Sequence, residues 1–455
     1  MAGTFSSQSK IRPGAYVTFK SMPSATLTPG VRGIVAIPMT LAWGDTSNLI
    51  EITADDYLNG RIFEKLGMNV GDTAAIPLRE IFKNASTALV GRLNTSGVKA
   101  SKKVNLTATE VTLTARHSGT LGNQIAVACE RNASTNALEL SITVGGTVVE
   151  RQVVTRLSSF VANPWVTIEY TGTDDPMFSE FAVADGTLTG GTDGAAPTDS
   201  GVANYTAFMQ KCSGQIWNVL AVPSNNTTIL ANVLTYIKGL REDDGKKVQA
   251  VVCGYANADY EGIISVEQGY LIGDEVVSVE NFAAYVAGMT AGASIVDSNT
   301  YKVIEGATGI VNPLSSTLIE QGLSQGKLML SMRQDRAVVV EKDINTLHTF
   351  TTEKSYIFSK NRIIRCLDDI ATQVTTLFET GFIGKVNNDE SGRTLFRGAV
   401  IGYLNNLQTQ GAIQNFNSAT DITVSAGNDI ESVVCGLAVQ PIDSMEKLYM
   451  TVVVS

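Results

Sequence analysis

The clearest hydrophobic pattern in the chain is a period-two alternation at its two ends, which is typical of β-strands. The closing segment alternates between two faces and comprises Leu448, Tyr449, Met450, Thr451, Val452, Val453 and Val454. A matching segment near the N-terminus comprises Ala15, Tyr16, Val17, Thr18, Phe19 and Lys20. Because an unpaired strand readily pairs with another chain, both ends are predicted to bind further copies of this protein.

Two stretches of the chain alternate short apolar runs with amphipathic segments. Strands are predicted at 33–38 and 87–93 with helices between them, and the same pattern returns from Ile216 to a last strand at Tyr301–Ile304. Alternating strands and helices predict a mostly parallel sheet. Residues 21–97 and 195–345 are therefore predicted to form one discontinuous α/β domain.

The stretch between these two halves has a different pattern. It is rich in Thr and Val with period-two alternation, and Gly145-Gly146 is a two-residue hairpin signal. Residues 98–194 are therefore predicted to form an inserted all-β module. The module ends in a Gly-rich segment, 186–201, which we expect to be an unpacked linker because it has few apolar residues.

The last hundred or so residues form another predicted unit. Amphipathic helices are expected at about 359–381 and 394–409, followed by strands at 422–424 and 433–439. The predicted fold class is thus α/β and multidomain. It consists of an N-terminal arm (1–20), the α/β domain with its inserted β module, an α+β C-terminal domain (346–447) and a C-terminal arm strand (448–455).

Composition limits the possible functions. Charged residues make up 17% of the chain, the net charge is −10 and no block of five or more Lys/Arg occurs, which disfavours nucleic-acid binding. The five cysteines lie far apart without Cys-x-x-Cys spacing, so we expect small buried side chains rather than disulfides or a zinc site. The N-terminus lacks a secretion-signal pattern and no apolar run approaches a membrane span.

Catalytic motifs are weak. Gly322-Leu323-Ser324-Gln325-Gly326 matches the hydrolase pattern G-x-S-x-G, but a helical pattern precedes it and a strand follows, the reverse of what that motif requires. Residues 239–247 miss the phosphate-loop spacing and contain three consecutive acids. Both segments are interpreted as helix ends with turns. His117 and His348 supply no triad, so we expect no enzyme, no cofactor and no metal site.

Several segments together resemble a known family. Four segments occur in the order seen in contractile-tail sheath proteins: Arg12-Pro13-Gly14-Ala15-Tyr16-Val17, Asp343-Ile344-Asn345-Thr346-Leu347, Asn361-Arg362-Ile363-Ile364-Arg365 and Ser444-Met445-Glu446-Lys447-Leu448-Tyr449-Met450-Thr451-Val452. Ile383-Gly384-Lys385-Val386-Asn387-Asn388 fits the same family. The chain therefore resembles a sheath protein of a myophage or of a phage-tail-like bacteriocin, most strongly over 292–455 and at the N-terminal arm.

The resemblance implies a structural role. Sheath subunits form hexameric layers in a helical array around an inner tail tube, with baseplate and terminator proteins at its ends. Their terminal arms complete sheets in neighbouring C-terminal domains, and contraction drives the tube through a bacterial envelope. The implied location is a virion tail or an extracellular tail-like particle made in a bacterial cytoplasm, without direct nucleic-acid binding or membrane insertion.

Two hypotheses remain open at this point. A basic stretch without an intervening acid comprises Lys354, Lys360, Arg362 and Arg365, and it would bind carboxylates of the inner tube. The alternative function is an outward-facing adhesin or cell-surface-binding protein in which the β module recognises the target. That alternative needs exposed aromatic side chains, whereas Trp165 is expected to lie in the core of the module.

Overall fold

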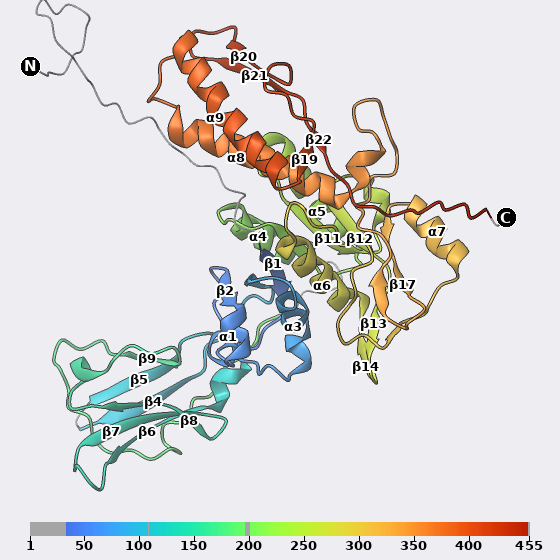
Figure 1. Ribbon diagram of the computed structural model, residues 1–455. Coiled ribbons are helices and arrows are strands. Elements are labelled where there is room, and N and C mark those ends of the chain that lie inside the picture. Colours follow the sequence, from blue (N-terminus) through green and yellow to red (C-terminus); the bar gives the residue numbers. More distant parts are fainter. Residues whose placement is uncertain (1–32, 108, 196–200, 454–455) are drawn as a thin grey trace, which may run out of the picture. The chain divides into compact units, whose positions relative to one another are not determined.

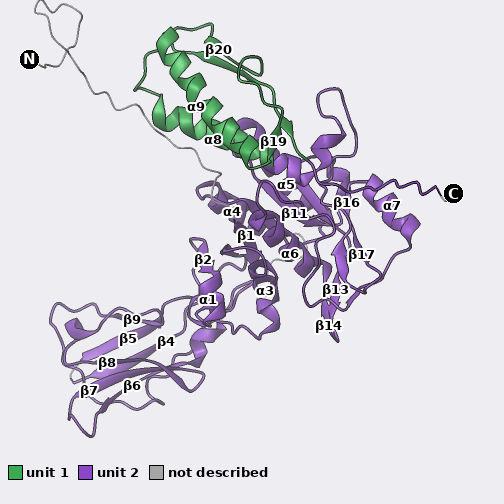
Figure 2. Ribbon diagram, in the orientation of Figure 1, with its two compact units in different colours: residues 1–30, 366–442 green, residues 31–365, 443–455 purple. Residues whose placement is uncertain are grey.

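The computed structural model describes residues 33–107, 109–195 and 201–453 (Figure 1). By its internal contacts the chain divides into two compact units (Figure 2). The described part of the smaller one, residues 366–442, is called the C-terminal unit below. The larger one, called the main unit, comprises residues 31–365 together with 443–455. The boundaries thus fall at 366 and 443, whereas the sequence pattern suggested 346 and 448.

A seven-stranded sheet forms the centre of the main unit, with the order β16-β12-β11-β10-β1-β3-β2. All neighbours are parallel except β2 and β3, so the predicted mostly parallel sheet is confirmed. The strands are β1 (Ile34–Met39), β2 (Ile50–Thr53), β3 (Thr87–Arg92), β10 (Val219–Val222), β11 (Gln249–Cys253), β12 (Ile263–Val266) and β16 (Lys327–Leu328).

Helices cover both faces of this sheet because its strands are apolar on both sides. Along β1, Val35 and Ile37 face a core with α3 (Ile76–Phe82) and α6 (Val279–Gly292), whereas Ala36 faces a second core. The second core contains residues of α4 (Val202–Ser213) and α5 (Thr227–Lys238). The other helices of the main unit are α1 (Ala54–Leu58), α2 (Ile62–Leu66) and α7 (Ser316–Ser324). Thr53 caps α1, and its side chain accepts a hydrogen bond from the backbone of Asp56.

Short antiparallel strands extend the main unit beyond β12. They are β13 (Tyr270–Ile272), β14 (Glu275–Val277), β15 (Gly309–Ile310), β17 (Leu330–Met332) and β18 (Val338–Val340). The strand predicted at Tyr301–Ile304 is wrong. Tyr301 has a left-handed backbone with φ of 59°, which interrupts an extended chain, and only Val303 forms an isolated bridge, to Val339.

Residues 101–169 form the expected β module, which lies at the lower left of Figure 1. One sheet has the order β4-β5-β9 and the other β6-β7-β8, around a shared core that includes Trp165. The strands are β4 (Ser101–Leu106), β5 (Thr109–Ala115), β6 (Ile125–Arg131), β7 (Leu138–Val144), β8 (Thr147–Val153) and β9 (Val166–Glu169). Gly145 and Gly146 form the predicted turn between β7 and β8, both with positive φ.

The prediction of an unpacked Gly-rich linker is wrong for residues 186–195, which pack against the module. Leu188 is fully buried, and isolated bridges join Thr189 to Ser101 and Thr192 to Val98. The glycines serve close packing rather than flexibility: a Cβ on Gly186 would lie 1.9 Å from the carbonyl oxygen of Val127. We call residues 181–195 the strap, because they run along the edges of β4 and β6.

The C-terminal unit consists of two helices and two short ribbons. The first helix, α8 (Asn361–Gly381), begins in the main unit, and α9 (Glu390–Thr409) begins four residues earlier than its apolar pattern indicated. Asp389 provides the reason, since its side chain accepts a hydrogen bond from the backbone of Gly392 and caps the helix. The ribbons are β19 (Ile413–Gln414) with β22 (Gln440–Pro441), and β20 (Ile422–Ala426) with β21 (Val433–Leu437).

Candidate assembly surfaces

The C-terminal segment, residues 447–453, is an exposed and mainly apolar stretch that forms no strand and pairs with no strand in the described part of the chain. Leu448 is 85% exposed and Tyr449 is 88% exposed. Exposed side chains of this kind are the expected signature of a surface that another molecule covers. Val454 and the predicted N-terminal strand from Ala15 to Lys20 lie outside the described residues.

The residues just before this segment are fixed to the main unit. Lys360, whose side chain is only 3% exposed, forms ion pairs with Glu446 and, at 3.2 Å, with Asp443. The Thr300 hydroxyl donates a second hydrogen bond to Glu446 at 2.9 Å. The root of the C-terminal segment is thus held by buried charge, while the described residues beyond it, 448–453, are exposed.

The same network continues to the start of α8. The Thr300 hydroxyl accepts a hydrogen bond from the backbone of Asp343, and the Asp343 carboxylate binds Arg365 at 3.0 Å. Asn361 donates to the other carboxylate oxygen of Asp343 at 2.9 Å. Both Asp343 and Arg365 are 1% exposed. Buried, hydrogen-bonded ion pairs of this kind hold a defined geometry, so the points where the chain leaves and re-enters the main unit are both fixed.

This placement corrects part of the tube-binding hypothesis. Lys360 and Arg365 are buried and neutralised by acids of their own chain, so they are not available to a partner. Lys354 is partly exposed but pairs with Glu261 at 2.6 Å. Arg362, which is half-buried, is the member of the set for which the hypothesis still stands as a prediction. The sequence alone could not reveal these pairs, because the acids are distant along the chain.

The ribbon of β20 and β21 is the second candidate surface. Its β20 strand packs against α9 through buried Ile422. In β21, Val434 is 56% exposed and Cys435 is also exposed. Among the described residues, no further strand or bridge pairs with either β20 or β21. A two-stranded ribbon is only marginally stable by itself. Because neither outer edge of this ribbon has a partner strand among the described residues, each edge can accept a strand from another molecule.

The structure gives the catalytic candidates ordinary structural roles. Ser324 ends α7, and Gly326 takes the left-handed conformation of a turn. Residues 239–243 form a short π-helix directly after α5, which agrees with the interpretation of this segment as a helix end with a turn. His117 packs edge-on against Trp43, and burial lowers the pKa of His117 to about 4. His348 lies 3.3 Å from Asp259.

The cysteines follow the prediction with one exception. Cys129, Cys212, Cys253 and Cys366 are buried, and burial raises the pKa of Cys129 to about 11 and those of Cys212 and Cys253 to about 12. Cys435 is exposed, contrary to expectation, because it lies on the uncovered ribbon. The described residues contain no cluster of three or more potential metal ligands, and none of their helices is long and apolar enough to span a bilayer.

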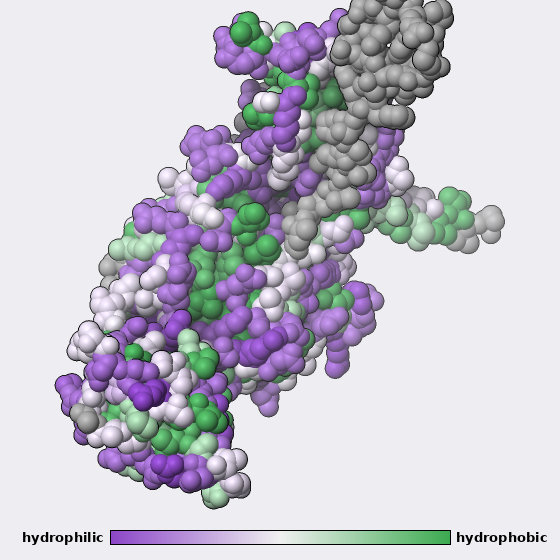
Figure 3. Space-filling view, turned by 90° about the vertical axis from the view of Figure 1, so that its left-hand side faces the viewer, coloured by the Kyte–Doolittle hydropathy of each residue, from purple (hydrophilic) through white to green (hydrophobic). Residues whose placement is uncertain are grey.

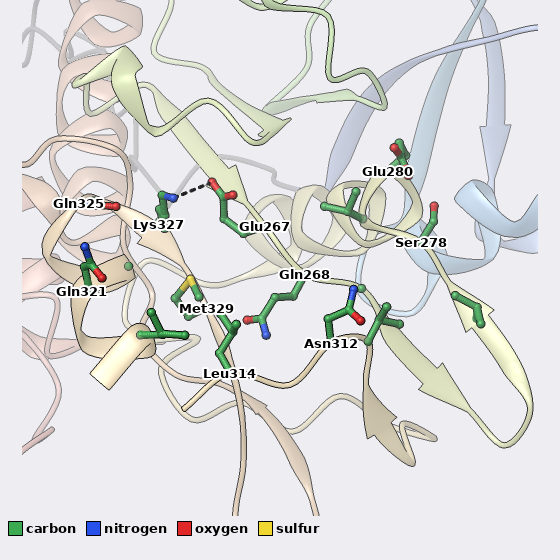
Figure 4. Close-up of a pocket in the computed structure, with 16 residues that line it drawn as sticks. Glu267, Gln268, Ser278, Glu280, Asn312, Leu314, Gln321, Gln325, Lys327 and Met329 are labelled. Carbon is green, nitrogen blue, oxygen red and sulfur yellow. Dashed lines mark ion pairs between the residues drawn. The ribbon is translucent and has the colours of Figure 1, made fainter. Parts of the chain in front are cut away.

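A cavity of about 620 Å³ lies in the main unit beside β12 and α7 (Figure 4). Met329 and Leu314 line it, and the Glu267–Lys327 ion pair of 3.8 Å lies at one side. The Gln268 side chain uses its oxygen to accept a hydrogen bond from Leu330. Its lining is mainly aliphatic and amide.

The chain matches four family models in succession. They are the tail sheath protein Gp18 domain III N-terminal region (32–93), the phage tail sheath protein β-sandwich domain (95–193), the phage tail sheath protein central domain (199–346) and the phage tail sheath C-terminal domain (353–455). The phage-like element PBSX protein XkdK of Bacillus subtilis is 34% identical over 100% of this chain and 99% of the relative.

Solved structures agree with these matches. The crystal structure of a sheath tail protein from Desulfitobacterium hafniense has a TM-score of 0.78 and 34% identity, covering 96% of this chain and 99% of that one. The helical sheath of the anti-feeding prophage in its contracted state, with a TM-score of 0.56 and 12% identity, covers 97% of this chain and 99% of that one and shares the fold.

The chain is therefore a structural protein of contractile tails, with the α/β multidomain fold of that class. It belongs to the phage tail sheath family. Its relatives come from phage tails and phage-like elements, which places it among the components of virion tails or tail-like particles.

Proposed function

We propose that this protein is the sheath subunit that polymerises helically around an inner tube, its terminal segments completing sheets in the C-terminal units of neighbouring copies. Hexameric layers stack along the tube between baseplate and terminator proteins, and contraction drives the tube through a bacterial envelope. Because each joint uses two different surfaces, the contact is heterologous and extends into a filament rather than closing as a dimer.

The exposed C-terminal segment with its buried root is the observation that carries this proposal. Lys360 and Thr300 hold Glu446, while the side chains from Leu448 to Val453 are exposed. A segment that is fixed at one end and apolar at the other is suited to reach a neighbour without leaving its own subunit. The open ribbon of β20 and β21 supplies the matching acceptor in the next copy.

Approximate energies explain why polymerisation needs a template. A strand of seven residues adds several backbone hydrogen bonds, each contributing about 0.5–1.5 kcal/mol, whereas ordering each residue costs about 1–2 kcal/mol. The backbone terms alone therefore oppose the joint. Burial of Leu448, Met450 and Val452, at about 1.5–3 kcal/mol for each side chain, favours the joint, and two joints in each subunit raise the effective concentration of the next.

The alternative adhesin function has no comparable support. Trp165, the side chain best suited to bind a sugar ring, is 4% exposed and stacks with Trp43 inside the module. In the lower part of Figure 3, polar residues dominate the visible face of the module and the hydrophobic ones form separate small groups. We therefore propose a sheath function alone.

Removal of residues 448–455 tests the proposal directly. The truncated chain keeps Lys447 and the Glu446 contacts, so it should fold normally by circular dichroism and sedimentation. With purified inner-tube protein it should form no striated tubes in negative-stain images. A matched variant with threonine at Leu448, Met450 and Val452 retains β propensity but loses apolar burial, and it should assemble only at higher concentration. Normal polymerisation of the truncated chain would contradict the proposed joint.

A further inference from the structure

The cavity beside β12 and α7 contains a buried polar group without a protein partner. Gln268 is only 5% exposed, and its side-chain oxygen accepts a hydrogen bond from the backbone of Leu330. The Nε2 amide of Gln268 is buried and donates to no group in the described part of the chain. Figure 4 shows this side chain between Leu314 and Asn312 in the lining. A buried donor without an acceptor is unfavourable, so the cavity is suited to a ligand that offers a carbonyl oxygen.

The rest of the lining favours an uncharged, aliphatic ligand. Leu314, Leu318 and Val276 line the cavity and are 38–56% exposed, so their apolar surface is open to a partner. Of the three charged side chains in the lining, Glu267 and Lys327 form an ion pair with each other. The volume of about 620 Å³ lies in the range of cavities that hold a small ligand or several side chains.

The C-terminal segment has the matching chemistry. Residues 448–453 contain no charged side chain, and four of the six are Leu, Met or Val. All six are exposed in the extended position that the structure describes. By contrast, residues 1–32 contain four Lys/Arg and no Asp or Glu, which suits an uncharged cavity poorly. The C-terminal segment is therefore the better occupant.

The root of the C-terminal segment lies within reach of the cavity. Four contacts in succession lead from one to the other: Glu446 to Thr300, Tyr301 to Val340, Val340 to Leu330, and Leu330 to Gln268. Taken end to end, these steps span at most about 26 Å, and the direct separation is shorter because they do not lie on one line. Residues 447–453, when extended, span about 23–25 Å, so the segment is long enough.

We propose that in the free subunit the C-terminal segment folds back into this cavity of its own chain. Val452 packs between Leu314 and Leu318, and a backbone carbonyl oxygen of the segment accepts a hydrogen bond from Gln268. The extended position is the one that a neighbouring copy binds. Because the same side chains fill either the cavity or the joint, the two positions exclude each other, and folding back restrains polymerisation.

This inference rests on the proposed function, because it assumes that the C-terminal segment forms the joint between copies. Only chains whose segment is released can join a neighbour, so the apparent affinity falls by the released fraction. With about nine chains in ten folded back, the protein concentration needed for assembly rises about tenfold. Blocking the cavity should therefore make assembly easier, whereas damage to the fold or to the joint would make it harder.

An assembly measurement on tubes tests this restraint. The variant L318E places a charge at the apolar rim, which opposes entry of the segment, and it should lower the concentration needed for assembly by up to about tenfold. The control T317E adds the same charge in the same first turn of α7, but Thr317 does not line the cavity, so it should assemble like the wild type. A concentration that L318E leaves unchanged or raises would overturn the proposal.

Disulfide trapping in the free subunit tests the contact without polymerisation. In chains that carry C435S, the pair L318C/V452C should form a bond within one chain at least about ten times faster than the pair L58C/V452C. Leu58 is the control because it is exposed on α1, which follows β2 at the opposite edge of the sheet from β16. Mass spectrometry of dilute protein identifies the bond.

Two results of the trapping would overturn the proposal. Equal rates for the two pairs would show that the segment does not enter the cavity. Covalent dimers in place of bonds within one chain would assign the cavity to a second copy. Failure of the wild-type chain to polymerise on tubes would instead refute the proposed function, and the trapping would still decide whether the segment folds back.

Discussion

The β module and the C-terminal unit differ in how far their sheet edges are covered. In the module, the strap bonds to one edge of each sheet, at β4 and β6, for example between the backbones of Cys129 and Phe181 and between those of Ser101 and Thr189. The outer edges of β8 and β9 have no partner strand among the described residues. In the C-terminal unit, no described strand or bridge pairs with either outer edge of the β20–β21 ribbon. Covered edges prevent association, whereas open edges permit it, so we expect the ribbon, with neither edge covered, to form the joints between copies.

The largest expected effect comes from blocking the open ribbon. A lysine at Val434, which is 56% exposed in β21, should leave the subunit folded but abolish assembly, because edge lysines oppose strand addition. Sedimentation with inner-tube protein measures the polymer. The matched change V148K, at a 43% exposed position in β8 of the module, should leave the polymer unaffected. Equal effects of the two changes would remove the distinction between the units.

Disrupting the ion pairs at the root of the C-terminal segment should have a smaller effect, on the stability of the subunit. The variant K360M leaves Glu446 and Asp443 without their cation, and we expect it to lower the free energy of unfolding by about 2–3 kcal/mol. This is less than for a fully buried pair, because the Asp443 side chain is 31% exposed. Urea titration measures the change. The double variant K360M/E446Q should recover part of the loss, and simple addition of the two single effects would argue against a coupled pair.

A pH-dependent effect should separate the module from the C-terminal unit. Burial lowers the pKa of His117 from 6.5 to about 4, so the folded module favours the neutral ring. Above about pH 6.5, His117 does not reduce the free energy of unfolding of the module. As the pH falls from about 6.5 to about 4, protonation of His117 should lower that free energy by about 1–3 kcal/mol, after allowance for partial exposure. Hydrogen exchange at pH 7 and pH 5 should show faster opening of module peptides.

The C-terminal unit supplies the internal control for that measurement, since residues 366–442 contain no histidine. Its peptides should lose much less protection over the same pH range, once the intrinsic exchange rate is corrected. The variant H117N should weaken the response of the module. A module that keeps its protection at pH 5 would show that His117 does not report on its stability.

Local sequence patterns predicted most of the fold but did not reveal contacts between residues that are far apart in the sequence. The period-two pattern located the module, and the apolar stripes located α8 and α9. The strap was missed because glycine predicts flexibility in most sequences, whereas Gly186 and Gly194 allow close backbone contact. The start of α9 was missed because its first turn is polar and only the Asp389 cap marks it.

The candidate site shows the same limit. The alternation from Leu448 to Val453 predicted a strand that pairs with another chain. The structure shows these side chains exposed but assigns no strand to them, so the strand and its pairing stay a prediction. Lys360 and Arg365 looked like part of a surface patch because no acid lies between Lys354 and Arg365 in the sequence. Their partners Glu446 and Asp343 become neighbours only after folding.

Hydrogen exchange of the assembled sheath compared with the free subunit is the most direct test of the account. Strand addition at the ribbon predicts strong new protection of amides in 422–437 and 448–453 on assembly, while β4–β9 of the module change little. Unchanged exchange in 422–437 and 448–453, with new protection concentrated in the module, would contradict the claim that open edges of the C-terminal unit join the copies.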